Sequence, residues 1–275
     1  MKAEELLTKK YPCLDENCTI SELIGLMIKT KDNFALVFSG KRYLGYADKK
    51  SLMKYRVDVD VMKVKKIVVK VPKLNPESNE LEMAKLFSTS DAKALPVFEK
   101  EKIIGIVKAK DLVYALKDYY KKANADEMMS SSLLVLNEDD EIGYALSHMK
   151  EKNVHRAPVV DNKNNLSGII SLIDLFTDYY LVSRSKGIRL SRASSHQKGK
   201  RGGFGIGEKQ DLLKLPLKNI MTNHSECCCC SGKTIISEVI ELMNKDSVSS
   251  VVIVEKNKPV GIITFKDILM DFAKR

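Results

Sequence analysis

Two patterns of apolar and polar residues alternate along this chain, and their order repeats four times. Short apolar runs lie at 34–38, 94–98, 156–160 and 250–254. Each is followed by a second apolar run that contains a glycine: Gly45, Gly105, Gly168 or Gly261. Short apolar runs bounded by polar turn residues are typical of β-strands, so each pair of runs predicts a hairpin.

A helical pattern precedes each predicted hairpin. Between 141 and 149, the apolar residues Ile142, Ala145, Leu146 and Met149 recur at the i, i+3, i+4, i+7 spacing of one helical face. Matching patterns begin near Ile20, Leu81 and Ile235. A further short strand before each helix completes a unit with the order strand, helix, strand, strand, helix.

Each second strand ends in the same short motif. Its fullest copies, at 168–175 and 261–268, read Gly-apolar-apolar-Ser/Thr-x-x-Asp-apolar. The copy at 105–112 has Lys108 in place of the hydroxyl residue. The copy at 45–52 is altered most, because Asp48 stands at the Ser/Thr position and Ser51 stands at the Asp position. The hydroxyl-x-x-Asp spacing predicts a capping box where the strand turns into a helix.

The glycine spacing divides the chain into four repeats and one insertion. The repeats are assigned to 1–56, 57–122, 123–182 and 211–275, with the insertion at 183–210. The insertion is basic, rich in Ser and Gly, and without apolar periodicity. Such a segment is typical of a flexible linker, and the alternative is an arm, at 183–207, that binds nucleic acid or an acidic partner.

A β-α-β-β-α unit that ends in this motif resembles the CBS domain (the cystathionine β-synthase motif). The segment 153–161, continued by 168–175, is especially similar to the γ regulatory subunits of AMP-activated protein kinases. The resemblance implies an α/β (α+β) fold of four CBS repeats that form two Bateman modules in a disc-like arrangement. It pairs repeat 1 with repeat 2, and repeat 3 with repeat 4, with adenine nucleotides bound in the clefts between paired repeats.

The resemblance also implies the residues that contact a nucleotide. The ribose ligands would be Asp111, Asp174 and Asp267, with Ser171 and Thr264 on the phosphate side. His155 and Arg156 would contact phosphate, and Lys93 and Lys108 keep positive charge at matching positions of repeat 2. These residue types are suited to binding a nucleotide. Helix N-termini stabilise phosphates, and carboxylates accept hydrogen bonds from ribose hydroxyls. Guanidinium groups bind phosphate through two parallel hydrogen bonds. The alternative is that the hydroxyl and Asp only cap helices and that His155 is structural.

Repeat 1 departs from the motif in a way that affects its expected binding. A carboxylate at Asp48 would repel a phosphate at that position, so we expect the site on this repeat's own motif to be empty or weak. Three usable Asp positions among four repeats therefore predict two or three occupied sites.

Composition is consistent with a packed protein outside the membrane. With 275 residues, 44% of them apolar, the chain can bury a sizeable core, and no apolar run approaches the roughly 20 residues that span a bilayer. Six cysteines and a charged N-terminus without a signal peptide predict a cytoplasmic location. The net charge of +10 favours an anionic partner, although much of it is interpreted as a solvated Lys-rich surface.

Four consecutive cysteines, at 227–230, align with the first strand of repeat 3. Neighbouring side chains in a strand point to opposite faces, so this run is unsuited to a single zinc site. We interpret it as small apolar filler on one face, with a redox sensor as the alternative.

The sequence therefore predicts a non-enzymatic regulatory protein that senses energy state and acts on a partner in trans. The expected ligands are AMP, ADP or ATP, with no obligatory cofactor, no metal and no catalytic residues. S-adenosylmethionine is a weaker prediction, because it has no phosphate for His155 and Arg156 to contact. An unidentified protein effector is expected, and a homodimer and nucleic acid are further candidate partners. A nucleic-acid-associated protein that binds through the basic insertion is the alternative function.

Overall fold

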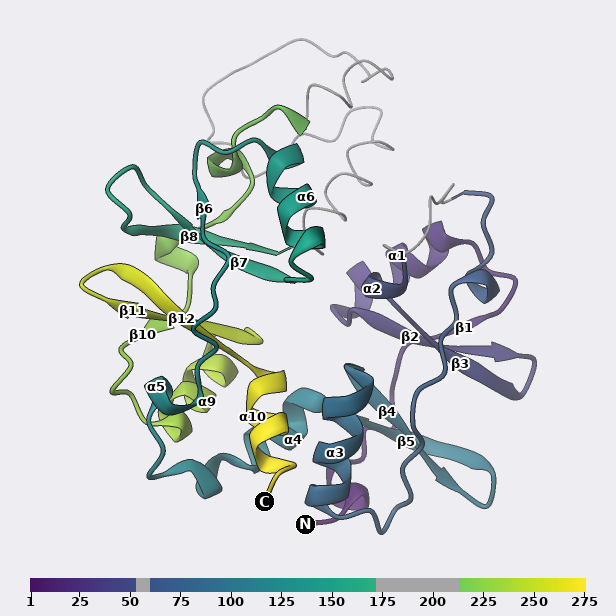
Figure 1. The fold of residues 1–275 in the computed structure, drawn as a ribbon. Coiled ribbons are helices and arrows are strands. Elements are labelled where there is room, and N and C mark those ends of the chain that lie inside the picture. Colours follow the sequence, from purple (N-terminus) through teal and green to yellow (C-terminus); the bar gives the residue numbers. More distant parts are fainter. Residues whose placement is uncertain (53–59, 172–212) are drawn as a thin grey trace. The chain divides into compact units, whose positions relative to one another are not determined.

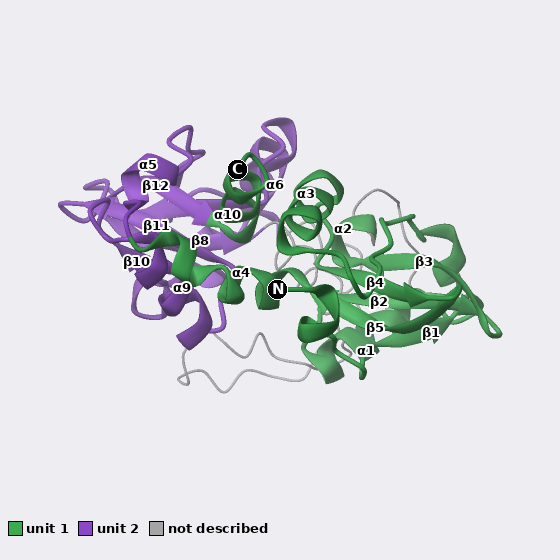
Figure 2. Cartoon of the chain, turned by 90° about the horizontal axis from the view of Figure 1, so that it is seen from below, with its two compact units in different colours: residues 1–121, 264–275 green, residues 122–263 purple. Residues whose placement is uncertain are grey.

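The computed structural model describes residues 1–52, 60–171 and 213–275, which form two compact units (Figure 2). The first unit comprises Met1–Lys121 and Thr264–Arg275, and the second comprises Lys122–Ile263. The predicted pairing of repeat 1 with repeat 2, and of repeat 3 with repeat 4, is confirmed. The last helix of repeat 4 belongs to the first unit. The insertion at 183–210 and Asp174 lie outside the described residues.

The first unit contains repeats 1 and 2 (Figure 1). Repeat 1 consists of η1 (Ala3–Leu6), β1 (Cys13–Asp15), α1 (Ile20–Thr30), β2 (Phe34–Ser39), β3 (Arg42–Asp48) and α2 (Lys49–Leu52). Repeat 2 consists of η2 (Val64–Lys66), α3 (Glu80–Ser90), β4 (Ala94–Glu99), β5 (Lys102–Lys108), α4 (Ala109–Ala115) and η3 (Lys117–Tyr120). In repeat 2 the first strand is reduced to one parallel bridge, between Leu74 and Val97.

The second unit contains repeats 3 and 4 up to Ile263. Repeat 3 consists of α5 (Ala125–Met128), β6 (Leu136–Asn137), α6 (Ile142–Glu151), β7 (Arg156–Val160) and β8 (Leu166–Ser171). Repeat 4 consists of η4 (Leu217–Asn219), β9 (Thr222–Asn223), η5 (His224–Glu226), β10 (Cys229–Cys230), α9 (Ile236–Lys245), β11 (Ser250–Glu255), β12 (Lys258–Thr264) and α10 (Phe265–Phe272). The predicted hairpin and the helix before it are therefore present in all four repeats, and the helix expected after the repeat 3 hairpin lies outside the described residues.

Each repeat uses the same strand pairing. The short first strand pairs in parallel with the first strand of the hairpin, as Cys13 does with Leu36. The hairpin itself is antiparallel, as in the pairing of Val37 with Gly45. A parallel pair needs a crossover connection, which the helix between the two strands supplies.

Paired repeats exchange backbone contacts reciprocally. The opening segment of one repeat forms a bridge with the second hairpin strand of its partner. These bridges are Thr8 with Ile106, Val69 with Tyr46, Ser130 with Ile262, and Thr222 with Ile169. In the first of them, the Thr8 N–H donates to the Ile106 carbonyl at 2.8 Å, and the Ile106 N–H donates back at 3.0 Å. This exchange joins the two repeats of each unit into one structure.

The exchanged segments explain the glycine of the motif. A Cβ atom at Gly105 would lie 2.9 Å from the Thr8 carbonyl oxygen, and one at Gly45 would lie 2.6 Å from the Val69 carbonyl oxygen. Gly168 is crowded in the same way by the Thr222 carbonyl oxygen, whereas Gly261 is crowded by the side chain of Met129. In the first three repeats the glycine is therefore required because the partner's backbone approaches closely.

The paired hairpins also share a core. In the first unit, Phe34 and Tyr46 of repeat 1 pack in one buried cluster with Ala94 and Ile106 of repeat 2. The Phe34 and Tyr46 rings stack with centroids 5.5 Å apart. Since these strands end beside one another, the polar residues that follow them are brought together at the junction between the repeats.

Helix α10 is fixed in the first unit by contacts with repeat 2. The Tyr120 hydroxyl donates to the Ile268 carbonyl oxygen at 3.1 Å and to the Asp271 carboxylate at 2.9 Å. The Tyr114 and Phe265 rings pack edge to face at 5.8 Å. Within the described parts of the chain, no helix combines the length and apolar character needed to cross a bilayer.

Candidate ligand-binding site

Arg156 connects the two repeats of the second unit. It is the first residue of β7 and pairs with Ser171, the last residue of β8. Its Nη1 donates to the Ser250 hydroxyl at 2.8 Å, and its Nη2 donates to the Ser249 hydroxyl at 2.9 Å. Both nitrogens of the guanidinium fork therefore contact repeat 4, which fixes the orientation of the cation at the repeat junction.

The surroundings of Arg156 are largely buried. Ser250 and Ser171 expose 4% and 9% of their surface, and His155 is half-buried. Burial raises the pKa of the Cys227 thiol to about 12, and the nearby positive charge of Arg156 opposes this shift. A fixed, planar cation bordered by hydroxyl groups is suited to binding an anion. The ribose position that the sequence places one turn beyond Ser171 lies outside the described residues.

The motif of repeat 4 forms a helix cap at the start of α10. The Thr264 N–H and hydroxyl both donate to the Asp267 carboxylate, at 2.7 and 2.6 Å. In return, the Thr264 hydroxyl accepts from the backbone N–H of Asp267, which completes a capping box. The structure thus shows the capping role of this pair, and the ligand role of both residues stays a prediction.

The motif of repeat 2 contains an ion pair. Lys108 Nζ donates to both carboxylate oxygens of Asp32, at 2.8 and 2.9 Å, and the two side chains are only 15% and 18% exposed. Asp111 is half-buried, and burial raises the pKa of its carboxyl while Lys110 and Lys108 oppose the shift. Lys93 lies immediately before β4, and its backbone N–H donates a hydrogen bond to the Tyr46 hydroxyl at 3.1 Å.

The altered motif of repeat 1 is also a helix cap, with the two roles exchanged. The Ser51 N–H donates to the Asp48 carboxylate at 2.7 Å, and the Asp48 N–H donates to the Ser51 hydroxyl at 2.9 Å. The two residues are only 8% and 2% exposed, and burial raises the pKa of Asp48. Exchanging Ser and Asp therefore preserves the cap, which accounts for the departure from the motif. The weak phosphate site expected here stays a prediction.

The four repeats match one family model. That model, described as CBS domain, covers residues 3–58, 61–118, 125–179 and 217–274. The chain belongs to the CBS domain family. The expected α/β fold of four CBS repeats is thereby confirmed.

Two curated relatives come from Methanocaldococcus jannaschii. An uncharacterized protein of Methanocaldococcus jannaschii is 30% identical over 102 residues, which are 37% of this chain and 34% of that protein. The inosine-5′-monophosphate dehydrogenase of the same organism is 33% identical over 139 residues, which are 49% of this chain and 27% of the enzyme. The CBS repeats thus match only a minor share of either relative's length.

Solved structures share the CBS fold over the whole length of this chain. A protein of M. jannaschii that has been proposed as an archaeal homologue of g-AMPK matches with a TM-score of 0.77. The two are 17% identical, and the match covers 99% of this chain and 100% of the other. This likeness shows the shared fold.

Several residues at the CBS repeat junctions could not be selected from sequence. Asp32, Ser249 and Ser250 are short polar residues just before a hairpin strand, where a turn or cap is the ordinary interpretation. A fourth such residue is Asp91, whose carboxylate accepts a hydrogen bond from Lys50 Nζ at 2.6 Å and lies 3.8 Å from Lys266 Nζ. The one signal that these four residues share is position, because each lies at the start of the first strand of a CBS hairpin or within three residues before it.

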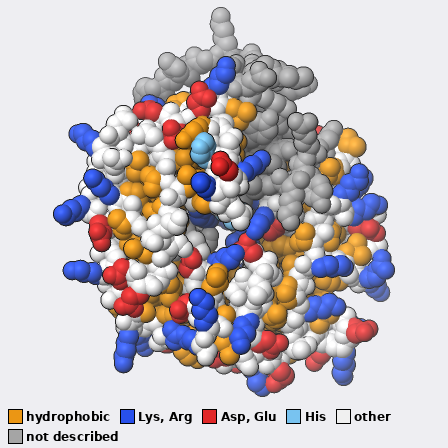
Figure 3. Space-filling view, in the orientation of Figure 1, with side chains coloured by type: hydrophobic (Ala, Val, Ile, Leu, Met, Phe, Trp, Pro, Cys, Tyr) orange, Lys and Arg blue, Asp and Glu red, His pale blue; other side chains and the backbone are white. Residues whose placement is uncertain are grey.

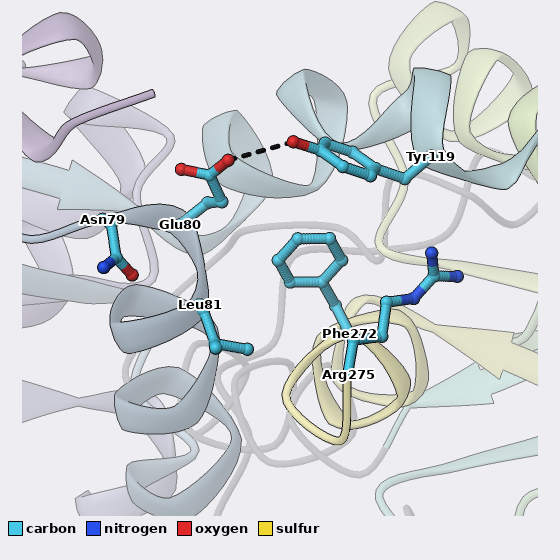
Figure 4. Close-up of a pocket in the computed structure, with 6 residues that line it drawn as sticks. All are labelled: Asn79, Glu80, Leu81, Tyr119, Phe272 and Arg275. Carbon is cyan, nitrogen blue, oxygen red and sulfur yellow. Dashed lines mark hydrogen bonds between the residues drawn. The ribbon is translucent and has the colours of Figure 1, made fainter.

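One pocket lies away from all the motif residues. It has a volume of about 500 Å³ and is lined by Asn79, Glu80, Leu81, Tyr119, Phe272 and Arg275 of the first unit (Figure 4). Tyr119 and Phe272 pack edge to face at 5.1 Å, and the Tyr119 hydroxyl donates to Glu80 at 3.0 Å. Since none of the eight predicted ligand residues that the structure describes lines it, this pocket does not coincide with the described CBS motif residues.

Three further features of the chain are its surface charge, its run of four cysteines and its potential metal ligands. Figure 3 shows Lys and Arg side chains scattered over the visible face among Asp and Glu side chains, as on a solvated surface. Cys227 to Cys230 are all partly buried, and burial raises the pKa of each thiol. The described ranges contain no cluster of three or more His, Cys, Asp or Glu side chains arranged to hold a metal ion.

Proposed function

We propose that this CBS-domain chain is a non-enzymatic regulatory protein that binds AMP, ADP or ATP in the second unit. The bound nucleotide would change the contacts of the chain with an effector protein in trans. A ligand shifts such an equilibrium only through its different affinities for the two states of the protein.

The observation that carries the proposal is the Arg156 guanidinium, which is held across the junction of repeats 3 and 4 by Ser249 and Ser250. A pre-oriented cation thus lies at the ends of paired strands, together with the hydroxyl groups of Ser249, Ser250 and Ser171. A phosphate can accept several charge-assisted hydrogen bonds from such a group, which a neutral ligand cannot. The net negative charge of a phosphate ester therefore suits this position better than S-adenosylmethionine, whose single carboxylate is accompanied by an ammonium and a sulfonium cation.

The relatives support a regulatory function of this kind. One of the full-length structural relatives is itself proposed as a homologue of g-AMPK. The curated relatives include a dehydrogenase that acts on inosine-5′-monophosphate, a purine nucleotide. Asp174, the ribose ligand that the sequence predicts for repeat 3, remains part of the proposal.

Isothermal titration calorimetry on protein stripped of co-purified ligand tests the proposal. Solutions of AMP, ADP, ATP, adenosine and S-adenosylmethionine are titrated into the full chain. We expect the three nucleotides to bind more tightly than adenosine and S-adenosylmethionine. Tighter binding of S-adenosylmethionine, or no binding of any of the five, would contradict the proposal.

A further inference from the structure

The ion pair of repeat 2 occupies the position that the CBS motif assigns to a phosphate. Lys108 stands where repeats 3 and 4 carry Ser171 and Thr264, at the junction of a strand and a helix. Its Nζ already donates to both oxygens of Asp32. The cation that would otherwise attract a phosphate is therefore bound to a carboxylate of the same chain.

Asp32 reaches Lys108 because of how α1 ends. Lys31 adopts a left-handed conformation, with φ of 58°, and terminates the helix immediately before Asp32. The next residues enter β2, where Phe34 packs in the core that repeats 1 and 2 share. The carboxylate thus belongs to repeat 1, while its partner belongs to repeat 2, and their positions are fixed by the same packed junction.

Electrostatics at this junction disfavour a second anion. The Asp32 charge contributes to the raised pKa of Asp111, so the two carboxylates interact. A phosphate that approached Lys108 would meet both carboxylates in a largely buried position, where repulsion between like charges is poorly screened. It could bind closely only if Asp32 moved away from Lys108.

We propose that Asp32 is a specificity-determining residue, an internal anion that takes the phosphate position of the repeat 2 motif and excludes phosphate-bearing ligands there. The inference rests on the proposed function, because it assumes that the motif marks a ligand position in the first unit as in the second. The ligand class that fits the first unit is accordingly a nucleoside or another molecule with no phosphate at this position. The two units then select different ligands.

The test uses inorganic tripolyphosphate, so that it does not depend on adenine recognition. Calorimetric titrations compare the full-length wild type with Asp32→Asn, Asp32→Ala and the double variant Asp32→Asn/Lys108→Met. Asp118→Asn is the matched control, because it removes the same charge from an exposed ion pair, with Lys121. Thermal unfolding of each variant verifies that it is folded before titration.

The expected result is that both Asp32 variants bind tripolyphosphate about tenfold more tightly, or at one more site, than the wild type and Asp118→Asn. The gain should be lost in the double variant, because it requires Lys108. Equal binding by the Asp32 variants and Asp118→Asn would overturn the inference, and so would a gain that persists without Lys108. Failure of the proposed function would appear separately, as absent ATP binding by the wild type.

Discussion

Replacing Arg156 with Ala removes the group on which the proposed nucleotide site depends. In the structure the guanidinium is oriented by hydrogen bonds of 2.8 and 2.9 Å to two serine hydroxyls. A hydrogen bond to a charged group contributes about 1.5–3 kcal/mol, and a half-buried position reduces screening by water. We therefore expect Arg156→Ala to weaken binding of ATP and AMP by about 2–3 kcal/mol, or roughly 30- to 150-fold in Kd.

The assay is isothermal titration calorimetry with ATP, AMP and adenosine on each variant. Adenosine has no phosphate, so its Kd should change by less than about threefold, under 1 kcal/mol. Arg156→Lys keeps the charge but loses the planar fork, and we expect an intermediate loss. Arg42→Ala is the matched control, since Arg42 is an exposed arginine at the start of β3. Binding by this control should equal that of the wild type.

The stability of the variant must be separated from its affinity. Arg156→Ala leaves the buried Ser250 hydroxyl without this donor, which costs about 1 kcal/mol of unfolding free energy. Titrations are therefore run well below the measured Tm of the variant. Equal losses of affinity for ATP, AMP and adenosine would refute the reasoning, because they would show that Arg156 supports the fold of the site without contacting phosphate.

Three further predictions follow from backbone packing, a buried carboxyl and the buried thiols. Gly105→Ala should lower the free energy of unfolding by about 1–3 kcal/mol in urea denaturation, because its Cβ would meet the exchanged backbone. Gly25→Ala, on an open face of α1, should instead raise it by about 0.5–1 kcal/mol, and equal effects would contradict this explanation. Because burial raises the pKa of Asp48, the folded state binds a proton there more readily than the unfolded state, and this group's contribution to stability falls as pH rises between the two pKa values. Asp48→Asn should thus stabilise the protein at pH 7, and its advantage should shrink toward pH 4, near the ordinary Asp pKa of about 3.9; a constant difference would argue against the shift. Finally, mass spectrometry after brief iodoacetamide treatment at pH 7.5 should find exposed Cys13 modified before Cys227, whose pKa is raised to about 12. Equal labelling of the two would count against the buried position of Cys227.

The repeat architecture could be predicted from sequence because its signals are local. Helical spacing in 142–149 and the apolar runs of the hairpins give the correct elements to within a residue or two at most boundaries. The exchange of opening segments between paired repeats leaves only an indirect signal. The motif glycines at 45 and 105 are that signal, but the carbonyl groups that require them lie in other repeats.

The candidate site could be predicted only in part, because its hydrogen-bond partners come from distant segments. The sequence predicts Arg156 as a ligand, yet Ser249 and Ser250, more than ninety residues away along the chain, carry no signal of their own. The sequence also predicts that Lys108 keeps positive charge for a phosphate, but the Asp32 carboxylate that pairs with it is 76 residues away. Side-chain pairing across a repeat junction depends on packing that a local pattern does not encode.

The most direct test of the central claim is a crystal structure of the full chain grown with AMP. The account predicts AMP in the second unit, with its phosphate within hydrogen-bond distance of the Arg156 guanidinium and close to Ser171. AMP bound elsewhere with its phosphate away from Arg156, or crystals at saturating AMP with that position empty, would contradict it.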